Sequence, residues 1–175
     1  RPKTEVARER VLAINSDCRV ESLQLFAGDE TLDEILDPKP DLLIDAIDSL
    51  NPKTGLLYAA WVRKIPTISS MGAALRTDPA LIRCGDLFST TNCPLAKHVR
   101  KRLRRRGMES GIFCVYSIEN IEFDYHRPED ELHVGETPFS GRGRRRNVLG
   151  SLPTITGIFG LTIANQAIVQ LTHCD

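Results

Sequence analysis

Two aspartates that follow an apolar run, Asp45 and Asp48, are the side chains of this sequence best suited to bind a metal ion. They belong to the segment Asp41-Leu-Leu-Ile-Asp-Ala-Ile-Asp-Ser49, which precedes a helix expected to begin near Asn51-Pro52. An apolar run bounded by acids is typical of a buried parallel strand, and ligands of open α/β sheets bind outside the carboxyl ends of the strands. A carboxylate at that edge could hold Mg²⁺, which keeps several waters and bridges to substrate phosphates.

The spacing alone does not decide the role of Asp48. One interpretation is a magnesium ligand, and the other is a cap on the first turn of the following helix. Asp45 projects from the opposite side of the strand, because side chains alternate along a strand, and is expected to be structural.

Lys3 is a candidate phosphate ligand. It follows Pro2 in the first turn of an expected helix, where free N–H groups and the helix dipole attract anions. The dipole disfavours a cation at that end unless an anion is bound. The alternative is a solvated surface lysine, which is the commoner role of a lone lysine. No glycine-rich phosphate loop, the usual companion of such a site, occurs in the sequence.

The densest positive charge lies in the run from Lys97 to Arg106, which we expect to form a helix from Pro94. Ala96, Val99 and Leu103 keep one apolar stripe, so most basic side chains fan out over the rest of the helix. A solubilising surface is the ordinary role of a charge run. The run contains no acid, however, which favours a polyanion such as RNA. The candidate RNA contacts are Lys97, Arg100, Lys101, Arg104 and Arg105.

The cysteines indicate a reducing compartment and no structural zinc site. Five are present, and no Cys-x-x-Cys pair occurs. Cys93, ahead of the basic helix, is the best candidate for a low-pKa thiol, although we expect no catalysis by it. Cys114 lies in an apolar run and is expected to be an inert core thiol.

The bulk composition indicates one soluble, cytoplasmic domain with no membrane partner. The chain has 175 residues, of which 41% are hydrophobic and 26% charged, and its formal net charge is zero. No signal peptide is expected at the start of the sequence. Polar residues interrupt the apolar stretch 149–171, which we expect to be a buried core helix rather than a membrane span.

Alternating strands and helices must position these residues. This alternation predicts an α/β fold with a parallel, helix-covered sheet. We expect a nucleotide-site half over 1–80, a substrate half with the basic helix over 81–175, and a mobile loop at about 123–147. Arg142-Gly-Arg-Arg-Arg146 in that loop could fold onto RNA or be uninvolved. The expected helices are 2–15, 32–36, 52–64, 94–106 and 154–171, and the expected strands are 18–26, 41–47, 65–70, 81–87 and 112–117.

The first half resembles the ThiF/MoeB/HesA superfamily, the adenylation domains related to ubiquitin-activating enzymes. The resemblance rests on Pro2-Lys3, Leu12-Ala-Ile-Asn15, Cys18-Arg-Val20 and Asp45-Ala-Ile-Asp48 in this order. It implies a Rossmann-like, mostly parallel sheet with helices on both faces, and ATP and Mg²⁺ as cofactors. It also implies that Lys3 contacts the ATP phosphates, that Asp48 holds magnesium and that both are catalytic, with Ser49 as a further nucleotide contact.

The second half resembles the tRNA threonylcarbamoyladenosine dehydratase branch of this superfamily. The matching segments are Met71-Gly-Ala-Ala74, Asp78 to Leu87, Cys93 to Gly107 and Cys114 to Ser117. The resemblance implies ATP-dependent activation and cyclising dehydration of a modified adenosine in tRNA, with the basic helix on the anticodon stem-loop. It also implies a homodimer, with a sulfur-relay or ubiquitin-like carrier protein as a further partner.

Two departures from the family pattern leave alternatives open. The family's first strand, glycine-rich loop and arginine-bearing segment precede the Pro-Lys element, so we expect this chain to lack the first βαβ unit and to be inactive alone. A cysteine common before the last helix of bacterial dehydratases has no counterpart in Asn147 to Ser151. The alternatives are adenylation of the C-terminus of a ubiquitin-like sulfur carrier, and a non-catalytic RNA-binding or dimerising relative.

Overall fold

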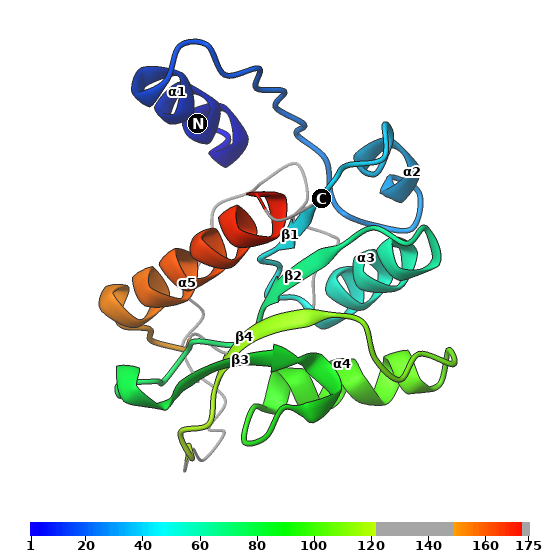
Figure 1. Ribbon diagram of the computed structural model, residues 1–175, viewed down its shortest axis with the longest axis vertical. Helices are drawn as coiled ribbons and strands as arrows, with labels where there is room; N and C mark the ends of the chain where they lie inside the picture. The colour runs from blue at the N-terminus through cyan, green and yellow to red at the C-terminus, as the bar shows by residue number, and fades with distance from the viewer. Residues whose placement is uncertain (122–148, 173–175) are drawn as a thin grey trace, which may run out of the picture.

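The computed structural model of the protein, shown in Figure 1, describes residues 1–121 and 149–172. Its elements are α1 (Lys3–Ile14), α2 (Leu32–Ile35), β1 (Leu43–Asp45), α3 (Leu50–Val62), β2 (Thr67–Ser70), η1 (Pro79–Leu81), β3 (Ile82–Asp86), η2 (Leu87–Ser89), α4 (Pro94–Arg104), β4 (Phe113–Ser117) and α5 (Pro153–Thr172). The expected loop at 123–147, including Arg142 to Arg146, lies outside the described residues.

The sheet has four strands in the order β1-β2-β4-β3. β1 pairs with β2 and β2 with β4 in parallel, whereas β3 pairs with β4 in the antiparallel direction. The prediction of a mostly parallel α/β sheet is therefore confirmed. Because β1, β2 and β4 run the same way, their carboxyl ends meet at one edge, which is where ligands bind in this class of fold.

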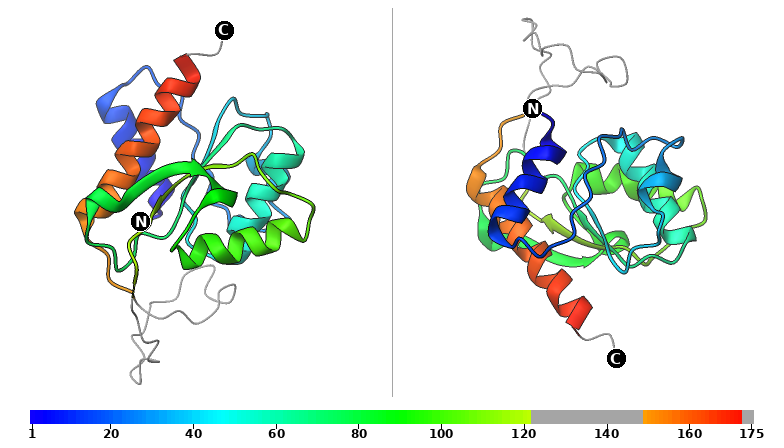
Figure 2. Two further views of the ribbon diagram at one scale, coloured as in Figure 1. Left: turned by 60° about the horizontal axis from the view of Figure 1, so that its bottom comes forward. Right: turned by 90° about the horizontal axis from the view of Figure 1, so that it is seen from above.

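Helices cover both faces of the sheet, with α3 and α4 on one face and α5 on the other (Figures 1 and 2). The alternation of β4 decides which face each side chain joins. Cys114 is buried in one cluster with Leu57 of α3 and Val99 of α4. Val115, the next residue, is buried with Phe159 of α5.

The expected strand at 18–26 is wrong. These residues have no regular secondary structure, although Val20, Leu23 and Leu25 are half-buried and the polar Glu21 and Gln24 between them are exposed. A strand needs a neighbour to exchange ladder hydrogen bonds with. Among the described residues, no strand pairs with this segment, and periodicity alone cannot supply such a partner.

The expectation that the last helix is buried in the core is also wrong in part. Ile155, Phe159, Ile163 and Ala167 form one buried stripe, but Leu161 and Ile168 are 73% and 61% exposed. Within the described part of the chain, α5 is the one helix long and apolar enough to cross a membrane. Its buried stripe packs on β2 and β4, so length and composition here describe a helix that covers a sheet.

Candidate functional site

The loop between β1 and α3 carries Asp48 and Ser49 at the carboxyl edge of the sheet. β1 ends at Asp45 and α3 begins at Leu50, so Asp48 stands in irregular backbone rather than in the strand. Ser49, and not Asp48, occupies the N-cap position of α3, and its hydroxyl donates to Asp48 Oδ1 at 3.4 Å. The helix-cap interpretation of Asp48 therefore does not fit the position it has.

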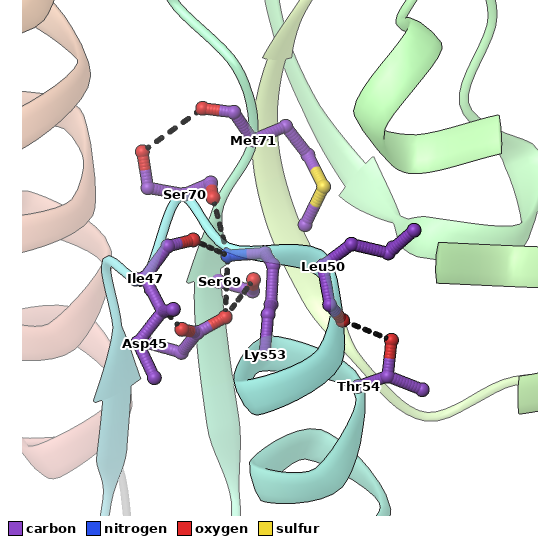
Figure 3. Close-up of polar contacts among 8 residues, drawn as sticks. All are labelled: Asp45, Ile47, Leu50, Lys53, Thr54, Ser69, Ser70 and Met71. Atoms are coloured by element: carbon purple, nitrogen blue, oxygen red, sulfur yellow. Dashed lines mark hydrogen bonds and ion pairs between the residues drawn. The ribbon is translucent and has the colours of Figure 1, made fainter. Parts of the chain in front are cut away.

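A buried network lies directly beneath this loop (Figure 3). Asp45 Oδ1 accepts from Ile47 N at 2.9 Å, and Asp45 Oδ2 accepts from Ser69 Oγ at 2.6 Å. Lys53 Nζ lies 2.6 Å from Asp45 Oδ2, and neither side chain is exposed to solvent. This agrees with the expected structural role of Asp45.

Sequence reasoning missed Lys53, although the sequence contained a signal for it. Lys53, Leu56, Leu57 and Ala60 recur at the spacing of one helix face, and all four are buried. A lysine in register with an apolar stripe must find an acceptor in the core, because an unpaired buried charge is too costly. Ser69 offered no comparable signal, since its contact with Asp45 depends on the pairing of β1 with β2.

The segment that follows β2 is held in place by two charged side chains, Arg76 and Glu119. Arg76 is buried, and its guanidinium donates to the carbonyl of Asn92 at 2.9 Å and to the carbonyl of Glu119. Burial lowers the pKa of Arg76. The Glu119 carboxylate accepts the backbone N–H groups of Thr77 and Asp78, which lowers its pKa. These contacts tie the 76–78 segment to the end of β4.

The basic helix α4 is anchored by its apolar stripe and by some of its own arginines. Ala96, Val99 and Leu103 are buried, as predicted. Arg102 donates to Asn51 Oδ1 in the first turn of α3. This hydrogen bond joins the basic helix to the helix that begins directly after Ser49.

The five predicted RNA contacts on α4 are not equivalent. Arg100 is half-buried and donates to the Thr90 hydroxyl, whereas the other four are exposed. The guanidinium of Arg104 lies 5.6 Å from the centre of the Phe88 ring. The exposed members of the five are Lys97, Lys101, Arg104 and Arg105, and Arg106, which was not among the predicted contacts, is exposed as well.

Lys3 stands outside the network around Asp45. It is exposed in the first turn of α1, a helix without a buried residue. Figures 1 and 2 show α1 on the α5 side of the sheet, away from α4.

The two candidate cysteines are both buried. Cys114 lies in the sheet, where burial raises the pKa of its thiol to about 12. It fits the predicted inert core thiol. Cys93 occupies the N-cap position of α4, where its sulfur accepts from Ala96 N at 3.5 Å.

Comparisons with known proteins identify relatives of this chain. It is 38% identical to the Bacillus subtilis tRNA threonylcarbamoyladenosine dehydratase over 68% of its length and 47% of the relative's. It is 33% identical to the Saccharomyces cerevisiae tRNA threonylcarbamoyladenosine dehydratase 2 over 98% of its length and 40% of the relative's. The chain thus spans about half the length of these curated relatives.

Solved structures agree with the fold and with the family. The Escherichia coli tRNA N6-threonylcarbamoyladenosine dehydratase in complex with AMP matches with a TM-score of 0.78 and 28% identity, covering 97% of this chain and 64% of that one. The same enzyme in complex with ATP matches with a TM-score of 0.77. A model described as the ThiF family matches residues 1–175, and the chain belongs to this family.

Proposed function

We propose that this chain forms the nucleotide-binding and RNA-binding part of an enzyme that uses ATP to activate and dehydrate threonylcarbamoyladenosine in tRNA. One observation carries the proposal. The basic helix α4 contacts the first turn of α3 through the hydrogen bond from Arg102 to Asn51, and α3 begins directly after the loop that carries Asp48 and Ser49. An edge that combines a nucleotide loop with a polyanion surface suits a reaction between ATP and tRNA. The similarity to dehydratases solved with ATP and AMP supports it.

Asp48 and Ser49 would hold the phosphate side of ATP together with Mg²⁺. The residues fit this ion, because Mg²⁺ usually takes one or two carboxylates and fills its other positions with water and substrate phosphates. Among the described residues, no cluster of three His, Cys, Asp or Glu side chains could hold a metal ion. When bound, Mg²⁺ supplies charge neutralisation at the phosphates. Lys3 would add a further positive charge there.

The proposed reaction removes one water molecule in two steps. The carboxylate of the threonylcarbamoyl group attacks the α-phosphorus of ATP, and pyrophosphate leaves. A nitrogen of the same modified base then attacks the activated carbonyl, the ring closes and AMP leaves. The work of the protein is to hold the carboxylate in line with the phosphate and to stabilise the developing charge.

The exposed basic side chains of α4 would bind the tRNA backbone. Lys97, Lys101 and Arg105 recur every four residues and therefore share one helix face. Contacts of this kind hold phosphates without reading sequence, so the base itself would be selected at the nucleotide loop. In this arrangement residues 1–80 form the nucleotide-site half, and the chain from residue 81 forms the substrate half.

A homodimer is part of the proposal. Exposed large apolar side chains on α1 and α5 support it, because such side chains mark an interaction site where they gather in a patch. Ile14 is 81% exposed, and Leu161 and Ile168 are also largely exposed.

The experiment that tests the function is ATP–pyrophosphate exchange by the full-length protein. Exchange should depend on tRNA that carries threonylcarbamoyladenosine and should fall by about 100-fold or more in Asp48→Ala, the loss typical of a group that stabilises transition-state charge. Lys3→Ala should lower it as well. Stimulation by a ubiquitin-like carrier protein instead of tRNA would favour carrier adenylation. Binding of tRNA without any exchange would favour the non-catalytic alternative.

A further inference from the structure

Lys53, which is buried in a pair with Asp45, uses all of its hydrogen-bond donors at the carboxyl edge of the sheet. Lys53 Nζ donates to Ile47 O at 2.9 Å and to Ser70 O at 2.8 Å, in addition to its contact with Asp45 Oδ2. An ammonium group has three N–H donors, and here each has an acceptor. The acceptors come from the β1–α3 loop, from β1 and from the end of β2, so one side chain joins two neighbouring strands where they end (Figure 3).

Stability alone does not account for this pair. Removing a lysine and an aspartate from water costs several kcal/mol per ion, and apolar residues of similar volume often serve a core equally well. Lys53 also lies in the first turns of α3, where the helix dipole disfavours a cation. A charge kept at such an unfavourable position points to a requirement for a particular geometry.

The pair fixes the backbone conformation of Ile47, the residue before Asp48. Ile47 donates its N–H to Asp45, and its carbonyl accepts from Lys53. Both polar groups of this peptide backbone are therefore held by buried charges, although residues 46–49 belong to no helix or strand. The direction in which the chain enters Asp48 and Ser49 is set by the pair rather than by secondary structure.

We infer that Lys53 is a positioning residue for the Asp48–Ser49 loop, and that it acts through Ile47 and Ser70 on the binding of magnesium and ATP. The inference rests on the proposed function, because it gives the loop a ligand. Lys53 itself is fully buried, so its side chain is not accessible to either substrate. Groups that orient a metal ligand from behind typically change metal affinity by about 10- to 100-fold when they are removed.

The test uses the double variant Asp45→Asn, Lys53→Met in the full-length protein. It removes both charges together, so neither is left buried and unpaired, while the bonds from Nζ to Ile47 and Ser70 are lost. We expect the KM for ATP and the Mg²⁺ concentration for half-maximal exchange to rise by about tenfold. The dissociation constant for tRNA should stay within about twofold of the parent value, because α4 is unchanged.

Two further variants make the result specific. Phe159→Leu removes packing from α5 on the other face of the sheet and controls for lost stability, so its KM for ATP should not change. Ser69→Ala removes one hydrogen bond to Asp45 and no charge. Ser69→Ala should also raise the KM for ATP and the Mg²⁺ concentration for half-maximal exchange, by a smaller factor. It replaces the double variant as the test if the double variant does not fold.

The inference is overturned if the double variant, or Ser69→Ala in its place, keeps the ATP and Mg²⁺ dependence of the parent. It is equally overturned if Phe159→Leu, at a similar melting temperature, shows the same change. Asp48→Ala separates this failure from failure of the proposed function. If Asp48→Ala leaves the ATP and Mg²⁺ dependence intact, the nucleotide site itself is wrongly assigned. If only Asp48→Ala is impaired, the site stands and Lys53 does not position it.

Discussion

The two faces of the sheet hold their helices by different interactions. On one face, α3 and α4 combine apolar packing with a buried ion pair, a hydrogen bond between the helices and arginine–aromatic contacts. On the other face, α5 rests on an apolar stripe and leaves other apolar side chains exposed. Directional contacts fix geometry, whereas apolar burial mainly supplies free energy. The proposed chemistry therefore belongs to the α3–α4 side of the sheet, and the proposed association surface belongs to the α5 side.

The largest expected effect is on the α3–α4 side. Lys53→Met alone leaves the Asp45 carboxylate buried without a positive partner, which should lower the free energy of unfolding by about 3–5 kcal/mol. Urea unfolding followed by circular dichroism measures this change. The double variant with Asp45→Asn should recover most of the loss. If the single and double variants are equally unstable, the charge pair is not what fixes this face.

A smaller effect should divide the basic residues of α4 into two groups. Lys101→Ala removes an exposed charge, so tRNA binding should weaken and the slope of log affinity against log salt should fall by about 1. Arg100→Ala should leave that slope unchanged and lower the melting temperature, because Arg100 bonds to Thr90. Filter binding over a range of salt concentrations tests both variants. If both variants change the slope equally, burial does not decide which basic side chains reach RNA.

A still smaller effect concerns acid stability at the end of β4. The pKa of Glu119 is lowered in the folded state by the backbone N–H groups of Thr77 and Asp78. Its contribution to stability is therefore fully present above the pKa of an unfolded glutamate, about 4.3, and is lost as the pH falls through the lower folded-state pKa. The melting temperature of Glu119→Gln should lie below that of the parent at pH 7, and the difference should shrink as the pH falls below about 4.3 and through the lower folded-state pKa. A difference independent of pH would show that the carboxylate charge is irrelevant.

The smallest expected effect on folding is on the α5 side. Leu161 is 73% exposed, so Leu161→Ser should change the free energy of unfolding of the isolated subunit by no more than about 0.5 kcal/mol. The same change should weaken self-association, as measured by sedimentation velocity. Unchanged association would remove α5 from the proposed dimer surface.

The sequence predicted those features that depend on local periodicity. The apolar stripe of α4 and the alternation that buries Cys114 are both found as expected. The predicted strand at 18–26 failed because pairing depends on a distant neighbour rather than on its own alternation. The exposed side of α5 was missed because an apolar composition does not say how much surface the sheet can cover.

The candidate site was predicted in part, for a related reason. The segment Asp45 to Asp48 could be identified from its acids and its position after an apolar run. The role of Lys53 required the register of β1 with β2, which brings Ser69 beside Asp45 and the carbonyl of Ser70 within reach of α3. Contacts of this kind join residues 17 to 24 positions apart, and no local pattern encodes them.

The short strand β1 has a practical consequence for handling these residues as a separate polypeptide. β1 is the edge strand of the sheet, and among the described residues no strand pairs with its outer side. Ile44, in the middle of this strand, is half exposed and apolar. An unpaired, apolar edge is a template for strands of other molecules. A preparation of residues 1–175 alone is therefore expected to aggregate edge to edge, beginning at the strand that leads into Asp48.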